Sequence, residues 1–202
     1  MTAKSKQMME VYSQSFNGVW FGFACAQQRI ITSYFSATQQ LTLSKILSNI
    51  PFDVSFQVFH EPSPFAKNVL ASLKCLYDGK TIDGSLPLLL NRLPIYTQKV
   101  LKATLQIPLG YVTTYGSIAT ALGGGPRAVG NIMASNPFAP IVPCHRVVKS
   151  DFGIGGYGMG GIKVKVELLN REKQGFSESK SVHLNGSLLP IFPVEFALRN
   201  FQ

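Results

Sequence analysis

Cysteine, acidic residues and long apolar runs are all scarce in this sequence of 202 residues. The three cysteines, Cys25, Cys75 and Cys144, are odd in number and widely spaced, which fits a reducing compartment better than a disulfide-bonded scaffold. The apolar stretch 188–198 contains two prolines and a glutamate and is too short to span a bilayer. The first ten residues lack the apolar core of a signal peptide. These absences predict an intracellular protein, cytoplasmic or nuclear, without membrane association.

Metal ligands are equally sparse. His60 and His183 have no partner at the spacing of a metal site, and the cysteines form no C-x-x-C pair. We therefore expect no metal site and no other cofactor.

Only ten acidic residues oppose nineteen lysines and arginines, which gives a formal net charge of +9. Residues 92–173 contain ten basic and three acidic side chains, so this segment carries +7 of the total. Such a concentration is the expected footprint of a phosphate-binding surface. The alternative is a solvated basic face with no specific partner, and charge alone does not separate the two.

The hydropathy pattern predicts an N-terminal α/β domain, a small sheet with helices, over residues 1–91. Loose alternation on either side of Gln27 and Gln28 indicates a hairpin, and a Ser-Pro pair at Ser63 marks a helix start. The elements expected in order are a hairpin over 18–36, a helix over 41–50, a strand over 54–59, a helix over 63–77 and a strand over 86–90. Nothing in this domain indicates chemistry.

A mostly α-helical C-terminal domain containing a helix-turn-helix is expected over residues 92–175. Its helices are predicted over 94–106, 115–122, 127–135 and 162–173. Three glycines and a proline between the second and third of these predict a tight turn. Residues 176–202 show no charge bias and form a separate C-terminal tail of unreadable role.

The third of these helices has the composition of a DNA-contacting helix. It opens with Arg127 and continues with small residues that include Ala128 and Gly130. Small side chains allow close approach to a DNA backbone, and a guanidinium can stack where a base has been extruded. The alternative interpretation is an αα-hairpin whose small residues only permit close helix packing.

Cys144 is the candidate nucleophile. Cys25 and Cys75 lie in an apolar strand and on a helix, and we interpret both as small buried apolar side chains. Cys144 differs because Pro143 fixes the backbone before it and His145 follows it. An unperturbed thiol is only about 3% ionised at neutral pH, so a nucleophilic role needs a base.

His145 is the nearest candidate base, and Glu172 is the best-placed acid to orient it. Adjacent side chains in extended backbone point to opposite faces, so a water between Cys144 and His145 is favoured over a direct bond. The alternative for Glu172 is an ordinary solvated residue at a helix end.

The segment 153–158, Gly-Ile-Gly-Gly-Tyr-Gly, matches the G-x-G-x-x-G pattern of dinucleotide sites. In that fingerprint the helix opens within the glycines, whereas here it is expected only after Gly161. A flexible loop over the Cys144 site is the simpler interpretation. A nucleotide-dependent enzyme is the alternative.

Taken together, these segments make the chain resemble the O6-alkylguanine-DNA alkyltransferase family. The resemblance is carried by Tyr115, Arg127-Ala-Val-Gly130, Asn136-Pro137, Pro143-Cys-His-Arg-Val147, Gly156-Tyr157 and Leu168-Leu-x-x-Glu172. It covers residues 92–173 clearly and the first half only in outline. Non-catalytic relatives replace the cysteine, so the presence of Cys144 favours the active branch.

The resemblance implies a direct, irreversible, single-turnover transfer of an alkyl group from O6 of a flipped guanine, or O4 of thymine, to Cys144. It implies that His145 deprotonates Cys144 through a water, that Glu172 orients His145, and that Asn136 braces the segment beneath.

Binding roles are implied as well. Arg127 would fill the gap left by the base, on a helix that enters the minor groove of double-stranded DNA with Ala128 and Gly130. Tyr115 would crowd the target phosphate and hydrogen-bond the guanine. The guanine pocket would be formed by Tyr157 and by the backbone of Val147 and Cys144. The protein is expected to act as a monomer.

Three departures from the family pattern stand out. The loop 150–161 is longer than usual, so Tyr157, Gly158 and Met159 compete for the lining position. The ligands of the structural zinc found in some members cannot be assembled here, and the tail passes the family's usual end. The alternative function is a lesion-binding or regulatory protein that flips alkylated bases without repairing them.

Overall fold

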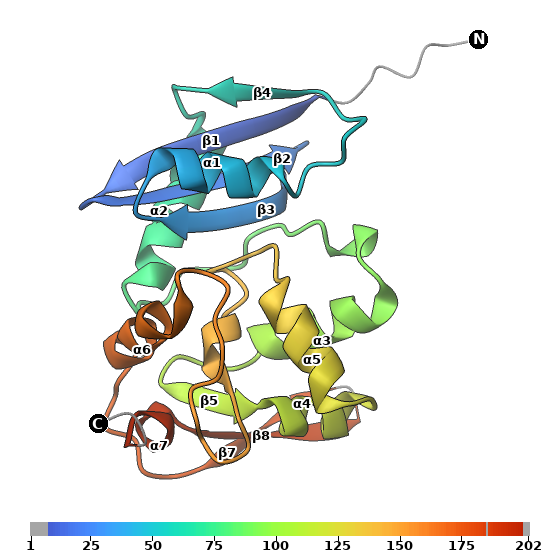
Figure 1. Cartoon of the computed structure of the whole chain (residues 1–202), viewed down its shortest axis with the longest axis vertical. Coiled ribbons are helices and arrows are strands. Elements are labelled where there is room, and N and C mark those ends of the chain that lie inside the picture. The colour runs from blue at the N-terminus through green and yellow to red at the C-terminus, as the bar shows by residue number, and fades with distance from the viewer. Residues whose placement is uncertain (1–7, 185, 200–202) are drawn as a thin grey trace. The chain divides into compact units, whose positions relative to one another are not determined.

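The computed structural model describes residues 8–184 and 186–199 (Figure 1). The ends of the predicted first domain and of the predicted tail, 1–7 and 200–202, lie outside the described residues. The chain divides into two compact units. The first contains the residues up to Cys75 with Ile82–Leu90 and Pro137–Ile141, and the second contains Leu76–Thr81, Asn91–Asn136 and the residues from Val142 onward. Each unit is a small mixed sheet with helices.

Unit 1 is built on a sheet with the order β3-β2-β1-β4. Its elements are β1 (Met9–Phe16), β2 (Val19–Ala26), β3 (Arg29–Ser36), α1 (Gln39–Leu47), β4 (Phe56–Phe59) and most of α2 (Pro64–Tyr77). β1, β2 and β3 are antiparallel neighbours, and β4 runs parallel to β1. Gln27 and Gln28 both have positive φ, the geometry of a two-residue hairpin turn. The predicted hairpin is confirmed as β2 and β3, whereas β1 was missed.

The two faces of this sheet are covered by different helices. A Cβ on Gly22 would lie only 2.7 Å from Ile46 of α1, so the glycine allows close packing of that helix. On the opposite face, Phe23 meets Phe65 of α2 edge-on with ring centroids 6.2 Å apart. The strand predicted over 86–90 is wrong. This segment forms only a single bridge between Leu88 and Ile30, since Pro87 cannot donate to a ladder.

Unit 2 contains a sheet with the order β6-β5-β8-β7, in which β5 is parallel to β6 and antiparallel to β8. Its helices are α3 (Ile95–Leu105), α4 (Tyr115–Leu122), α5 (Pro126–Ala134), α6 (Gly161–Arg171) and α7 (Val194–Arg199), and a 3-10 turn, η2, spans Cys144–Arg146. Its strands are β5 (Tyr111–Thr114), β6 (Val147–Val148), β7 (Lys180–Leu184) and β8 (Ser187–Pro193). All four predicted helices are present. A mostly α-helical domain is not confirmed, because this unit also contains a four-stranded sheet that the sequence did not predict.

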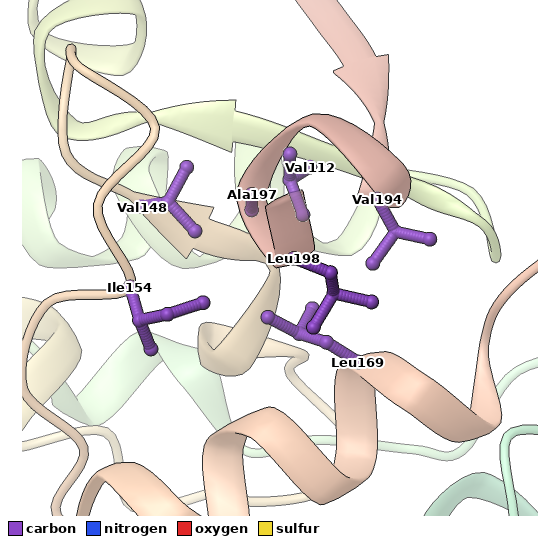
Figure 2. Close-up of a cluster of buried hydrophobic side chains, with 7 residues drawn as sticks. All are labelled: Val112, Val148, Ile154, Leu169, Val194, Ala197 and Leu198. Atoms are coloured by element: carbon purple, nitrogen blue, oxygen red, sulfur yellow. The ribbon is translucent and has the colours of Figure 1, made fainter. Parts of the chain in front are cut away.

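Residues 176–199 were expected to form a separate tail, but they belong to this sheet and its core. β7 and β8 form a hairpin, and β8 pairs with β5. The helix that follows, α7, packs into an apolar cluster with side chains from β5, β6, α6 and the loop after β6 (Figure 2). The cluster consists of Val112, Val148, Ile154, Leu169, Val194, Ala197 and Leu198. Within the described ranges, no helix has the length and apolarity needed to cross a membrane.

Candidate active site

Cys144 lies at the start of η2, between α5 and β6, and its side chain is buried. Its amide donates to the carbonyl of Val142 at 2.8 Å, which closes a tight turn centred on Pro143. Burial raises the pKa of the thiol, while a hydrogen bond with Asn136 and the charge of Lys165 oppose that rise. The resting group is therefore a neutral thiol that needs a base before it can act as a nucleophile.

The structure joins His145 to Glu172, as the sequence predicted. His145 Nε2 lies 2.8 Å from Glu172 Oε1, and both side chains are buried. Burial alone would raise the pKa of the carboxyl, but its contacts with His145 and Arg146 lower it to about 2. An ionised carboxylate can only accept, so Nε2 carries the proton and donates to it.

The other ring nitrogen, His145 Nδ1, is thereby left with a free lone pair. It is buried and has no hydrogen-bond partner among the described residues. Burial lowers the pKa of the imidazole, so the ring is neutral at pH 7. A neutral imidazole held in this tautomer can accept a proton at Nδ1.

Arg146 completes the carboxylate's environment, and sequence reasoning missed it. Its Nε donates to Glu172 Oε2 at 2.8 Å and its Nη2 to Oε1 at 2.9 Å, while Nη1 donates to the carbonyl of Ile107 at 2.6 Å. This is the bidentate pairing that holds a carboxylate in one orientation. The available signal was a charged residue inside the apolar run 141–148, because such residues are buried only when paired.

Lys165 is the second residue that was missed, and its side chain is fully buried. Its Nζ donates to the carbonyl of Val147 at 2.6 Å and approaches that of Gly156 at 3.5 Å. Burial lowers its pKa to about 8, so the ammonium form still predominates at pH 7. The available signal was its spacing of seven residues from Glu172, which places Lys165 on the side of α6 that leads to the glutamate just after the helix.

Two tyrosines, Tyr115 and Tyr157, lie close to the glycine loop and to His145. A Cβ on Gly155 would lie 3.2 Å from the Tyr115 hydroxyl, so the glycine loop runs against that tyrosine. Burial raises the pKa of Tyr115, which keeps its hydroxyl protonated. Tyr157 meets the His145 ring edge-on with centroids 6.4 Å apart. Tyr157, one of the three competing loop residues, is thus placed beside the histidine.

Asn136 lies just after α5, and its Nδ2 donates to the carbonyl of Val142 at 2.9 Å. This bond ties the end of α5 to the residue two positions before Cys144. Val147 is buried next to η2, and its carbonyl accepts the bond from Lys165. Asn136, Val147 and Cys144 therefore form one hydrogen-bonded segment.

The remaining predicted residues lie on α5. The turn before it contains Gly124 at φ 131, where a Cβ would collide with the hydroxyl of Tyr96. α5 begins at Pro126, so Arg127 is its second residue. Arg127 and Ala128 are exposed, and a Cβ on Gly130 would meet nothing within 4 Å. This face of α5 is open for contact with another molecule.

The glycine loop lacks the geometry of a dinucleotide site. α6 begins at Gly161, after the glycines, and no side chain caps it. The carbonyl of Gly156 instead lies 3.5 Å from Lys165 Nζ. In the part of the chain that the structure describes, no three histidine, cysteine or acidic side chains are placed to hold a metal ion.

Comparisons with known proteins agree on one family. Residues 95–174 match the model of the 6-O-methylguanine DNA methyltransferase DNA-binding domain. A methylated-DNA–protein-cysteine methyltransferase of Methanothermobacter thermautotrophicus is 38% identical over 112 residues, which is 55% of this chain and 63% of that protein. Its counterpart from Pyrobaculum aerophilum is 60% identical over 68 residues, 34% of this chain and 45% of that protein. The matched stretch is thus less than two thirds of these relatives' length.

Solved structures extend the similarity over more of the chain. The O6-methylguanine-DNA methyltransferase of Pyrococcus kodakaraensis is 30% identical with a TM-score of 0.63, covering 82% of this chain and 99% of that one. Mycobacterium tuberculosis OGT in complex with DNA is 28% identical with a TM-score of 0.62, covering 81% and 92%.

Proposed function

Because the chain belongs to the O6-alkylguanine-DNA alkyltransferase (methylated-DNA–protein-cysteine methyltransferase) family, we propose that it repairs DNA by moving an alkyl group from O6 of guanine to Cys144. The observation that carries this proposal is the buried series of Cys144, His145 and Glu172. The series places a buried thiol next in sequence to a neutral base, and that base is hydrogen-bonded to an ionised carboxylate.

The first step is removal of the thiol proton. A water between Cys144 Sγ and His145 Nδ1 would accept it and pass it to the imidazole. The imidazolium that results is stabilised by the Glu172 carboxylate at 2.8 Å. Asn136 and the Lys165 ammonium lower the pKa of Cys144, so both favour the thiolate as it forms.

The second step is a displacement at the alkyl carbon. The new bond joins this carbon to Cys144 Sγ while the bond from carbon to O6 breaks, and its electron pair enters the guanine ring. The proton lost by the thiol is balanced by the one that guanine regains at N1. The Tyr115 hydroxyl, protonated because burial raises its pKa, can donate a hydrogen bond to the leaving base. The product is a thioether, so each molecule acts once.

Recognition of the extruded base would use the backbone. A carbonyl has two lone pairs, so the Val147 oxygen can accept from the guanine edge while it accepts from Lys165. The carbonyl of Cys144 can contribute in the same way. Tyr157, beside His145, would line the pocket.

DNA binding is assigned to α4 and α5, which we propose to act as a helix-turn-helix. The basic segment 92–173 supplies the phosphate contacts. The small residues Ala128 and Gly130 would let α5 lie in the minor groove, where sequence readout is weak. Weak readout suits repair of a lesion in any sequence, and Arg127 would stack in place of the extruded guanine.

Replacing Arg127 with alanine is expected to slow repair of an alkylated duplex about 10-fold while leaving transfer from the free modified base within about 2-fold, because only the duplex requires base extrusion. Both rates can be measured by single-turnover kinetics. Lys45→Ala removes an exposed charge outside the basic segment and is the control. Equal losses on the two substrates would contradict the flipping role.

Replacing His145 with alanine is expected to slow alkyl transfer roughly 10²–10⁴-fold, the usual contribution of a general base. Affinity for duplex DNA should change little, since His145 is buried and lies outside α5. Stopped-flow transfer and fluorescence anisotropy measure the two quantities, with the exposed His183→Ala as control. A matching drop in affinity would indicate a structural histidine.

The proposed function is tested by mixing increasing amounts of protein with an O6-methylguanine duplex and analysing the bases that remain. Transfer predicts that the lesion disappears in proportion to the protein added and that guanine replaces it. A protein that only binds lesions would hold the duplex tightly and leave every methylated base in place.

A further inference from the structure

The loop that follows β6, residues 149–160, packs against side chains of the C-terminal segment, β8 and α7. Phe152 meets Phe192 of β8 edge-on with ring centroids 5.0 Å apart, and it meets Phe196 of α7 at 5.6 Å. Phe152 also adopts a φ of 60°, which a bulky residue keeps only where its surroundings impose it. The two phenylalanines therefore hold the ring of Phe152, while its amide donates to the carbonyl of Lys149 at 3.0 Å.

A second anchor lies two residues further along. Ile154 is buried and belongs to the apolar cluster of unit 2. Figure 2 shows its side chain extending from the loop toward Leu198 of α7 and Leu169 of α6. The first half of the loop is thus packed against residues 192–198.

The second half of the same loop carries groups of the reaction site. Gly155 lies against the Tyr115 hydroxyl, the carbonyl of Gly156 faces Lys165 Nζ, and Tyr157 meets the His145 ring. Only two residues, Gly155 and Gly156, separate Ile154 from Tyr157. Movement of the anchored half would therefore be transmitted directly to the residues around Cys144.

The apolar cluster of unit 2 also holds α6 in place, through Leu169. Leu169 lies on the face of α6 that also carries Lys165, one turn before it, and Glu172, just after the helix. Packing of Leu198 against Leu169 therefore stabilises the helix between its two buried charged residues. The C-terminal segment contacts both supports of the site, the loop and the helix.

We propose that residues 187–199 are a positioning element of the reaction site, in which Phe192 and Phe196 hold the loop that places Tyr157 over the extruded base. The inference rests on the proposed function for its substrate, but the holding of the loop can be measured without it. None of these residues touches the reacting atoms. They act through Phe152 and Ile154.

The test uses the full-length chain with Phe192→Ala and Phe196→Ala, and with Phe192→Leu as the conservative variant. Leu189→Ala is the matched control, because Leu189 is buried on β8 but lies outside the cluster. One measurement is hydrogen exchange of the peptide covering residues 149–160. The other is benzyl transfer from free O6-benzylguanine, recorded as half-saturating concentration and maximal rate at a temperature where every variant is folded.

The expected result for both alanine variants is exchange of the loop amides about 10-fold faster, because the bond from Lys149 N to Gly153 O opens more often. The half-saturating concentration should rise about 10-fold while the maximal rate falls less, since a displaced pocket wall weakens binding of the base first. Phe192→Leu should restore most of both values.

Loop exchange and half-saturation no different from those of Leu189→Ala would overturn the positioning role. If the intact chain transfers no benzyl group, methyl transfer from the O6-methylguanine duplex still decides the proposed function. The exchange data then decide the inference alone, with faster loop exchange supporting it and unchanged exchange overturning it.

Discussion

Replacing Cys144 with alanine is expected to abolish alkyl transfer to the protein. No other described sulfur has the same surroundings. Burial, together with the nearby Glu10 carboxylate, raises the pKa of Cys25 to about 12, so that thiol stays protonated. Cys75 lies on α2 between Lys74 and Leu76, with no histidine beside it in the sequence. Radiolabelled methyl transfer from duplex DNA measures the effect.

Cys75→Ala is the control and should transfer at the rate of the unmodified chain. Affinity of Cys144→Ala for undamaged duplex should also be unchanged, because the residues proposed to contact DNA lie on α5 rather than on η2. Residual label on the Cys144→Ala protein would show that another group accepts the alkyl group, and it would remove the proposed mechanism.

Replacing Glu172 with glutamine is expected to damage both catalysis and stability. A neutral amide can donate to His145 Nε2 as well as accept from it, so the proton is no longer held away from Nδ1. Transfer should slow roughly 10²–10⁴-fold. The buried guanidinium of Arg146 loses its counter-ion, which should cost about 3–5 kcal/mol of unfolding free energy.

The pH dependence of stability follows from the same residue. The pKa of Glu172 is about 2 in the folded chain against an ordinary value of 4.5. A depressed carboxyl pKa stabilises the fold above the unfolded value, here by roughly 3 kcal/mol, and this contribution is lost as pH falls from 4.5 toward 2. Urea unfolding between pH 3 and pH 7 should show this loss in the unmodified chain and a weaker slope in Glu172→Gln.

Glu167→Gln is the control for both effects, because Glu167 is exposed and its distance to Arg171 is 3.8 Å. A surface pair of this kind contributes about 0–1 kcal/mol. If Glu172→Gln and Glu167→Gln had equal stability and equal transfer rates, the buried carboxylate would have neither role.

The candidate site could be predicted where residues adjacent in the sequence carry the reactive groups. Cys144 and His145 are adjacent in the sequence, between a proline and an arginine. A candidate thiol and a candidate base can therefore be recognised without knowledge of the fold. Glu172 was matched to them as the best-placed acid in the sequence, and the family pattern around Leu168 then pointed to the same residue. Arg146 and Lys165 were missed because their roles depend on burial, which brings their charges to Glu172 and to the carbonyl of Val147.

The helices of unit 2 were predicted because periodicity and glycine turns are local signals. Its sheet was not, since β6 has only two residues and β8 contains Pro190 and Pro193. Proline is uncommon within paired strands, and the pattern therefore favoured an irregular tail. β8 pairs with β5, and α7 packs on Leu169. These contacts join residues far apart in the sequence, so local hydropathy patterns do not reveal them.

The most direct test of the central claim is the mass of each peptide after the intact chain has reacted with an O6-methylguanine duplex. The proposed chemistry predicts a gain of one methyl group on the peptide that contains Cys144 and none elsewhere. An unmodified Cys144 peptide from protein that has bound the lesion would contradict it.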